Sequence, residues 1–575
     1  MNRERRFSAT VAAERVLRLN FNDSDDSSNE ESDDEETDSE VDEAVENVLT
    51  SEESSDEEDS LDRPNADNPT PTLNSGPHQS TLSSKNGTIL WNSMPEDRRG
   101  RARAVNVLRQ TPGPTRYISQ NCSSAQDCFM EFITTEMLNE IVSSTNERGR
   151  LHTQNWIDTD IEEITKFIGA LLLAGVYLSK NEPVAQLWNR QDGRPIFSQI
   201  MSRNRFSQLT SALRFDERST RNERRSRDKL APIRTIWNKF IVRCRRNYIP
   251  NDTMTVDEQL LTFRGRCSFK MFIPSKPGRY GIKIWALCDA DNNYFYNGDV
   301  YTGRQGTQRE VNQSMRVVLE LTEPISNTAR NIVGDNFFSS VPLVKSLLAR
   351  NLTYFGTIRQ NKPELPQAFQ PNRFRDPEST LFGFNDNITI VSYVPKRKKA
   401  VNLISTFHHT AEISNNRGKP QVIIDYNSCK SGVDTLDQNV RKYSCKRRTR
   451  RWPMALFYNI LDIAAFNSFV IFRNLHPGWH LRKPYRRRLF LITLARQLAG
   501  IEGEDSQLRR TDRPIRRTAT VSATGDDEPA AKKSRCSLCG WRQDRKTRTK
   551  CSSCQTHVCN EHSSVICARC KDDIE

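Results

Sequence analysis

Long apolar runs are scarce in this sequence, and their scarcity bounds where the protein can work. No window approaches the roughly 20 apolar residues that a transmembrane helix needs. The first ten residues, MNRERRFSAT, lack the apolar stretch of a secretory signal peptide. We therefore expect an intracellular protein that has no membrane partner. Seven of the 14 cysteines are scattered before residue 446, which is typical of buried thiols in a reducing compartment.

Basic residues are absent from one long stretch near the N-terminus. Residues 21–62 contain 21 acidic side chains and no lysine or arginine, and their low apolar content predicts disorder. The remainder of the chain carries a surplus of 34 basic residues, which is typical of a protein that binds a polyanion such as nucleic acid. We interpret the acidic stretch as a solubilising tail. The alternative is that it competes with DNA for the basic surface.

The other seven cysteines crowd into the last forty residues. With one histidine they form four ligand pairs, which are Cys536 and Cys539, Cys551 and Cys554, Cys559 and His562, and Cys567 and Cys570. Four pairs are enough for two structural Zn2+ ions, and metal binding would stabilise a segment too short to build a core. Either the first and third pairs share one zinc in a cross-braced module, or the pairs combine in sequence order. We interpret His557 as a spare surface histidine.

Basic residues lie within and just before this cysteine-rich segment. Five of them are candidates for phosphate contacts, namely Arg542, Arg545, Lys546, Arg548 and Lys550. Together with the preceding Lys532, Lys533 and Arg535 they resemble a split nuclear localisation signal. We therefore expect a nuclear protein whose zinc module binds DNA.

Helical and strand-like patterns alternate along the rest of the chain. Apolar spacing predicts helices in EITKFIGALLLAGVYL, FSQIMSRNRFSQLTSALRF and IRTIWNKFIVRCRRNYI. From about residue 253, TMTVDEQLLTF and ARNIVGDNFF predict strands, and KIWALCDADNNYFYNGDVY predicts a hairpin that turns at Asp-Asn-Asn. More strands follow in a Pro-rich stretch, and then a helical block, WPMALFYNILDIAAFNSFVIF. This order predicts an α/β catalytic core set into a helical domain that is built from both sides of it.

Two aspartates, Asp434 and Asp437, lie three residues apart in the stretch SGVDTLDQ. Ser431 and Asp434 have the spacing of a capping box, which predicts that a helix begins here. The buried stripe of this helix would consist of Val433, Leu436 and Val440. On this interpretation alone, the aspartates do no more than start a helix.

Carboxylates at strand ends and helix starts are also candidates for divalent metal ligands. Two-metal phosphodiester cleavage needs a few carboxylates that converge on Mg2+ ions roughly 4 Å apart, and Mg2+ prefers oxygen ligands. Asp257 lies in the first predicted strand of the core, Asp335 ends a strand, and Asp434 or Asp437 begins a helix. Each of them alone is a weak candidate, because an aspartate at a strand end is usually a turn or cap residue.

Six blocks of sequence, taken in order, give the chain a family resemblance. They are TVDEQLLTFRGRC, RYGIKI, GDNFFSS, RGKPQVIIDYN, SGVDTLDQ and RRWPMALFYN, and they resemble the blocks of piggyBac-type DNA transposases. The cysteine-rich tail is similar to the C-terminal domain of that family. The resemblance implies a multidomain α/β protein. Its RNase H-like catalytic core, a mixed sheet with flanking helices, would carry an inserted β-rich domain and lie within an α-helical dimerisation and DNA-binding domain, followed by a cross-braced zinc module.

The resemblance also implies domain boundaries. We predict a disordered acidic region and linker at 1–112, the helical domain at 113–252 and 451–500, the catalytic core at 253–362 and 421–450, the insertion domain at 363–420, a basic linker at 501–535, and the cysteine-rich domain at 536–575.

The family's catalytic site implies roles for the four aspartates. Asp257, Asp335 and Asp434 would bind Mg2+ or Mn2+, and Asp437 would support them. Residues that the resemblance implies to act around DNA are Arg304, Arg330, Asn336, Arg359 and Lys362. Trp452, which lies between basic residues and Pro453, is a candidate for stacking on a base. Surface charge is the alternative interpretation for the basic ones, and a core aromatic is the alternative for Trp452.

The implied activity is cut-and-paste transposition. A protein of this family nicks the ends of its element, forms hairpins over TTAA, and joins the element to a TTAA target. The implied partners are the terminal inverted repeats, the target DNA and a second copy of the chain. One alternative is a domesticated, non-catalytic DNA-binding or chromatin-binding protein, although no catalytic acid is missing from the blocks. Another is a ubiquitin-type ligase, because a cross-braced zinc module can recruit protein partners.

Overall fold

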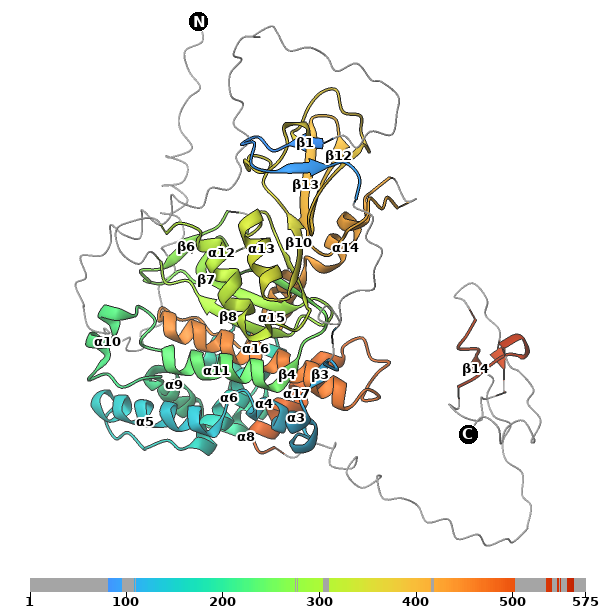
Figure 1. Ribbon diagram of the computed structural model, residues 1–575. Coiled ribbons are helices and arrows are strands. Elements are labelled where there is room, and N and C mark those ends of the chain that lie inside the picture. The colour runs from blue at the N-terminus through green and yellow to red at the C-terminus, as the bar shows by residue number, and fades with distance from the viewer. Residues whose placement is uncertain are drawn as a thin grey trace, which may run out of the picture. The chain divides into compact units, whose positions relative to one another are not determined.

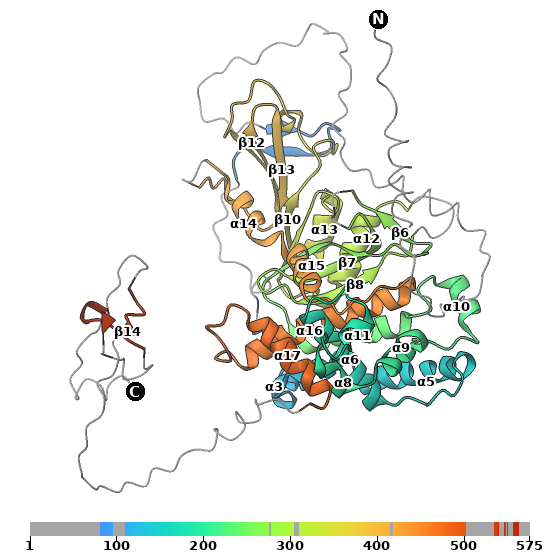
Figure 2. The same ribbon diagram turned by 180° about the vertical axis from the view of Figure 1, so that it is seen from behind.

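The computed structural model describes residues 81–95, 108, 110–274, 276, 278–303, 310–414, 418–501, 534–539, 546–547, 549 and 556–562. The chain divides into two compact units, residues 1–504 and 505–575, which are treated separately below. The first unit combines a large sheet with two groups of helices (Figures 1 and 2).

The centre of the first unit is a mixed sheet. In spatial order its strands are β10 (Thr353–Thr357), β9 (Asn331–Gly334), β5 (Thr253–Thr262) and β7 (Tyr280–Asp289), with β6 (Lys270–Phe272) and β8 (Phe295–Val300) both paired to β7. β5, β7 and β8 are antiparallel, whereas β9 is parallel to both β5 and β10. The predicted hairpin at Asp-Asn-Asn is confirmed as the turn between β7 and β8.

Different helices cover the two faces of this sheet. α12 (Gln313–Thr322) lies on one face, where Asn297 Nδ2 of β8 donates to the carbonyl of Leu321 over 2.8 Å. α15 (Gly432–Lys442) and α16 (Trp452–Leu475) lie on the other, where Gln259 of β5 contacts Asn459. α13 (Val341–Ala349) packs beside α12. A mixed sheet with flanking helices fits the predicted RNase H-like core.

The inserted strands extend the central sheet. β11 (Thr380–Asn385), β12 (Ile388–Lys396) and β13 (Lys399–Ser405) form an antiparallel meander, and β13 pairs with β10. Figure 1 shows β12 and β13 continuing away from β10. α14 (Gln421–Cys429) follows the meander and leads into α15.

The far edge of the meander is covered by a hairpin from the N-terminal region. β1 (Thr81–Ser83) pairs with β2 (Leu90–Asn92), and β2 pairs with β11. Trp91 is completely buried, and its Nε1 donates to the carbonyl of Glu364 over 3.0 Å. The prediction that residues 1–112 form only a disordered region and linker is therefore wrong for residues 81–95, because one tryptophan and a strand edge hold them on the sheet.

The helical part of the first unit is built from both sides of the core, as predicted. From the N-terminal side come α3 (Arg116–Asn121), α4 (Ala125–Met130), α5 (Thr135–His152), α6 (Ile161–Val176), α7 (Val184–Leu187), α8 (Pro195–Ile200), α9 (Arg203–Ala212), α10 (Arg221–Arg227) and α11 (Arg234–Asn247); from the C-terminal side come α16 and α17 (Arg486–Leu498). A two-strand pair, β3 (Gly113–Pro114) with β4 (Tyr248–Ile249), lies beside them. The sequence FSQIMSRNRFSQLTSALRF contains two helices, because Ser202 accepts the Arg205 N–H and starts α9.

α16 is the central helix of the unit. By length and composition it could cross a membrane, but 94% of its most apolar window is buried inside the protein. The expectation that no window approaches such a length is therefore wrong. Burial between the sheet and α4, α11 and α17 accounts for the apolar sequence of α16.

The second unit is small where the structure describes it. β14 (Ser534–Arg535) pairs with β15 (Lys546–Thr547), and a short 3-10 turn spans Asn560–His562.

The buried tryptophan of the N-terminal hairpin gives a test of the insert's stability. We expect Trp91→Ala to destabilise the insert by about 3–5 kcal/mol, because it removes a fully buried aromatic side chain. Hydrogen exchange of the β11–β13 amides measures this loss directly. The neighbouring Leu90 is 60% exposed, so Leu90→Ala is the control, and equal effects of the two variants would contradict the role of Trp91.

Candidate active site

The register of two strands, β5 and β9, brings Asp257 and Asp335 together. In the parallel pair of β5 and β9, Val256 lies opposite Gly334. Asp335 directly follows Gly334 and therefore reaches the position beside Asp257. The backbone N–H of Phe337 donates to Asp335 Oδ1 over 3.0 Å, and the N–H of Glu258 donates to Asp257 Oδ1 over 2.8 Å.

α15 carries Asp434 to the same face of the sheet. Residues two apart in a strand share a face, so Asp257 faces the same side as Thr255, whose Oγ1 donates to the carbonyl of Cys429 just before α15. A Cβ on Gly432 would lie 2.8 Å from Thr255 Oγ1. Only a glycine therefore lets α15 begin this close to β5, two residues before Asp434.

The helix that begins at SGVDTLDQ is confirmed, but its predicted capping box is not present. Ser431 is the N-cap residue, and its side chain makes no cap hydrogen bond. Val433, Leu436 and Val440 form the buried stripe as predicted. Asp434 is free to point outward, with 62% of its side chain exposed, and its Oδ1 accepts a hydrogen bond from Lys276 Nζ over 3.0 Å.

The electrostatics of the site indicate a place for a cation. Burial raises the pKa of Asp257 well above its usual range, and the negative charges of Glu258, Asp335 and Asp434 raise it further, against the effect of Lys276. Burial also raises the pKa of Asp335, followed by the charge of Glu258. Carboxylate oxygens that repel one another are the donor set that suits a hard divalent cation such as Mg2+. The residues present therefore fit the expected metal.

Asp437 has a different environment from the other three aspartates. It is buried, it pairs with Arg441 one turn along α15, and Gln259 Nε2 donates to its Oδ1 over 3.3 Å. Gln259 in turn contacts Asn459 of α16. Burial raises the pKa of Asp437, whereas Arg441 lowers it. These contacts fit the predicted supporting role, since they tie α15 to β5 and α16.

Sequence reasoning did not single out Tyr426, which faces the same group of carboxylates. Its hydroxyl lies 3.5 Å from Thr357 Oγ1, at the end of the strand next to β9. Burial raises the pKa of this hydroxyl, and the charges of Asp335, Asp257 and Asp434 raise it further. Tyr426 lies in the block RGKPQVIIDYN, and that position was the signal that could have found it.

Lys276 and Glu258 were also missed. Lys276 Nζ donates to Asp434 and to the backbone carbonyl of Glu258, over 3.0 and 3.2 Å. Burial would lower the pKa of Lys276, but the neighbouring carboxylates, Asp257 first, outweigh burial and raise it. Glu258 follows a catalytic candidate directly in TVDEQ, and that adjacency could have marked it.

The candidate DNA contacts fall into different environments. Asn336 and Arg359 are exposed, and Lys362 is partly exposed, in segments that follow β9 and β10. Trp452 packs edge-on against Phe269 with ring centroids 5.0 Å apart, which favours the core-aromatic interpretation. Lys546 is exposed on β15. Arg304, Arg542, Arg545, Arg548 and Lys550 lie outside the described residues.

The prediction that Arg330 acts around DNA needs correction. Its side chain is 1% exposed. The guanidinium donates to the carbonyls of Pro250 and Asn251 and to Gln110 Oε1. It therefore ties the start of β5 to β9, and its hydrogen-bonding capacity is used inside the protein.

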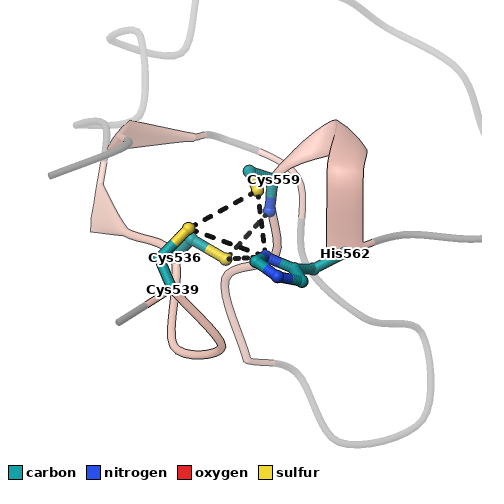
Figure 3. Close-up of side chains that lie close together, drawn as sticks. All are labelled: Cys536, Cys539, Cys559 and His562. Carbon is teal, nitrogen blue, oxygen red and sulfur yellow. Dashed lines mark hydrogen bonds between the residues drawn. The ribbon is translucent and has the colours of Figure 1, made fainter. Parts of the chain in front are cut away.

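The second unit contains a separate candidate metal centre. Cys536, Cys539, Cys559 and His562 place one ligand atom each within 4.8 Å of one another (Figure 3). Cys539 Sγ and Cys559 Sγ are 3.8 Å apart, and His562 Nδ1 lies 3.3 to 3.7 Å from the three sulfurs. Tetrahedral zinc with its usual bond lengths requires ligand separations of roughly 3.5 to 3.8 Å, so the four residues fit one zinc ion.

The first and third ligand pairs therefore combine, as the cross-braced alternative predicts and the sequence-order alternative does not. Cys551, Cys554, Cys567 and Cys570 lie outside the described residues. Cys536 Sγ also accepts the N–H of Cys559 over 3.2 Å. Burial alone would raise the pKa of Cys536, but this N–H and the other donors outweigh it and lower the pKa to about 6.

Comparison with known proteins decides the family. Residues 124–469 match the family model described as Transposase IS4. A solved piggyBac transposase, in a synaptic complex with hairpin DNA, is 36% identical in sequence, with a TM-score of 0.65; the match covers 80% of this chain and all of that one. This chain belongs to the piggyBac-type transposase family.

Two human relatives place the chain in the same family. PiggyBac transposable element-derived protein 3 is 24% identical over 56% of this chain and 55% of its own length. PiggyBac transposable element-derived protein 2 is 21% identical over 60% of this chain and 61% of its own length. The chain thus spans little more than half the length of the curated relatives it matches.

The Transposase IS4 match covers one of the two candidate sites and not the other. Residues 124–469 include Asp257, Asp335 and Asp434, together with both parts of the sheet that position them. The metal centre at 536–562 lies outside this range. The match to the family model therefore covers the carboxylate site. The evidence for the metal centre is the geometry of its four ligand residues.

The contact between Gly432 and Thr255 can be tested by adding one methyl group. We expect Gly432→Ala to lower the free energy of unfolding of the first unit by about 1–3 kcal/mol, because the new Cβ overpacks the start of α15. Urea unfolding measures this change. Gly478→Ala is the control, because a Cβ there would meet no atom within 4 Å; a cost as large as that of Gly432→Ala would contradict the packing argument.

Proposed function

We propose that this protein is a cut-and-paste DNA transposase that cleaves and joins DNA strands by metal-dependent phosphoryl transfer. The observation that carries the proposal is the convergence of Asp257, Asp335 and Asp434, from β5, the end of β9 and α15, on one face of the core sheet. Membership of the piggyBac-type family supports it. In this proposal the protein binds terminal inverted repeats and excises its element through hairpins. It integrates the element at TTAA.

The proposed mechanism assigns a role to each acidic residue. Mg2+ or Mn2+ at this site would supply a Lewis acid that activates the attacking oxygen and stabilises the leaving one. Asp257, Asp335 and Asp434 would hold the metal ions. Asp437 would hold α15 in register through its pair with Arg441.

A non-catalytic DNA-binding protein is the second candidate. Several buried carboxylates that raise one another's pKa destabilise the folded protein. A non-catalytic protein would gain no activity in return for this loss of stability. The intact acidic group therefore favours the enzyme. A homodimer on DNA, nuclear localisation and recognition of the inverted repeats by the cysteine-rich domain complete the proposal. They are supported by the basic surplus of the chain and its similarity to the solved synaptic complex.

Substitution of the aspartates tests the proposed chemistry. We expect Asp257→Asn, Asp335→Asn and Asp434→Asn each to slow strand cleavage by about 100-fold or more, since each removes a charged ligand from the reacting centre. The measurement uses duplexes that carry candidate inverted repeats, taken from the DNA flanking the coding sequence, with Mg2+. Asp291→Asn, in the exposed β7–β8 turn, is the control. Wild-type cleavage by any of the three variants would remove that residue from the site, and DNA binding without cleavage by the unmutated protein would favour the second candidate.

Removal of zinc tests the role of the second unit. We expect Cys559→Ser to reduce bound zinc and to abolish end-specific DNA binding, while the thermal unfolding of the first unit stays unchanged because the two units are separate. Metal analysis, footprinting and calorimetry provide the three readouts. Cys429→Ser is the matched control, because Cys429 lies in α14, outside the metal centre. Retention of end-specific binding in Cys559→Ser would refute this role.

A further inference from the structure

One ammonium group reaches directly into the carboxylate site. Lys276 lies in the turn between β6 and β7, with its Nζ 3.0 Å from Asp434 Oδ1, 3.2 Å from the carbonyl oxygen of Glu258 and 3.8 Å from Glu258 Oε1. The Lys276 side chain is 15% exposed, whereas that of Asp434 is 62% exposed. The lysine therefore points inward against the acids, and solvent reaches Asp434 from the other side.

The turn that carries Lys276 is fixed by its own backbone. The N–H of Lys276 donates to the carbonyl of Ile273, and the N–H of Arg279 donates to the carbonyl of Lys276, over 3.2 and 3.0 Å. Ile273 N–H closes the turn on the carbonyl of Arg279 over 2.7 Å. A Cβ on Gly278 would lie 2.3 Å from Thr262 Oγ1, so the turn also packs tightly on the end of β5. The described residues on both sides of Lys276 are therefore hydrogen-bonded to each other and packed against β5.

The other nearby lysine does not occupy the same place. Lys283 Nζ lies 3.9 Å from the centre of the Trp285 ring and 4.0 Å from Glu258 Oε2. Trp285 is paired with Glu258 in the sheet, so Lys283 lies over the face opposite to that of Asp257. Among the described residues, Lys276 is the lysine that touches a carboxylate proposed to bind metal.

A lysine and a divalent cation compete for the same carboxylate. The Asp434 oxygen that accepts from Lys276 is an oxygen that a metal ion would use, and two cations at one oxygen repel each other. An ammonium displaced from Asp434 could pair with an anion that is bound beside the site, and a phosphodiester is such an anion.

We infer that Lys276 pairs with Asp434 while the site is free of metal, is displaced when a divalent cation binds, and then contacts the phosphodiester to be cleaved. This inference rests on the proposed metal-dependent function. It adds a role for a lysine outside the group of acids, and it makes opposite predictions for metal affinity and for catalysis. Loss of the ammonium should strengthen metal binding and weaken cleavage.

The first measurement is Mn2+ affinity without DNA. We expect Lys276→Met, in the full-length protein, to bind Mn2+ about tenfold more tightly than the unmutated protein, because a neighbouring positive charge has been removed. Titration calorimetry and the electron paramagnetic resonance signal of free Mn2+ both report this affinity. Lys276→Arg keeps the charge and should bind Mn2+ as the unmutated protein does. Lys270→Met is the matched control, because Lys270 Nζ donates to the Gly265 carbonyl in the same hairpin.

The second measurement is cleavage at saturating Mn2+. We expect Lys276→Met to cleave at least about tenfold more slowly, despite its tighter metal binding, because the contact to the phosphodiester is lost. Lys276→Gln provides a second uncharged variant in case the methionine disturbs the turn, and circular dichroism checks the fold of both. Unchanged or weaker Mn2+ binding in both folded variants would overturn the inference, as would unimpaired cleavage.

The Asp434→Asn variant separates this inference from the proposed function. If Asp434→Asn loses Mn2+ and the Lys276 variants bind it normally, the metal site stands and the role of Lys276 is refuted. If Asp434→Asn binds Mn2+ normally, the proposed metal site itself fails, and the inference fails with it.

Discussion

The pairing of β5 with β7 on one side and β9 on the other determines where the candidate active site lies in this protein. The parallel register with β9 sets Asp335 beside Asp257, and the alternation of side chains turns Asp257 toward α15. A slip of one residue would turn Asp257 to the opposite face, where α12 packs. The inserted strands join the sheet at β10, on the far side of β9 from β5.

The third aspartate depends on contacts that come from the helical part of the unit. The segment after α15 is held at several points, since the backbone N–H of Cys445 donates to Asp462 in α16 and Arg451 donates to the carbonyls of Thr210 and Leu213. The chain Asp437, Gln259 and Asn459 joins α15, β5 and α16 through buried polar groups. Buried polar groups that satisfy one another fix relative positions more strictly than apolar packing does. The helical part therefore fixes the position of α15 and also covers one face of the sheet.

The elements that sequence reasoning predicted share one property, a local pattern that agrees with the final packing. The alternation in TMTVDEQLLTF and the buried stripe of Val433, Leu436 and Val440 are examples. The features it missed depend on contacts between distant segments. The indole N–H of Trp91, for example, donates to the carbonyl of Glu364, some 270 residues away in the sequence. Arg330 matches a family position that acts around DNA, but its side chain is buried and donates hydrogen bonds to carbonyls of the segment before β5. Sequence reasoning singled out the three aspartates because they lie in family blocks, and it missed Lys276 because a lone lysine in a turn gives no such signal.

The acidic site also affects the stability of the fold. Because burial and neighbouring acids raise the pKa of Asp257 and Asp335, the folded protein binds more protons than the unfolded chain at pH values between the ordinary and the raised pKa. Stability conferred by these groups is therefore greatest at low pH and is lost as the pH rises through that window. A divalent cation binds only the deprotonated carboxylates and so reverses the trend, releasing protons as it binds. At neutral pH the acids oppose folding of the metal-free protein, and the same repulsion provides the driving force for metal binding.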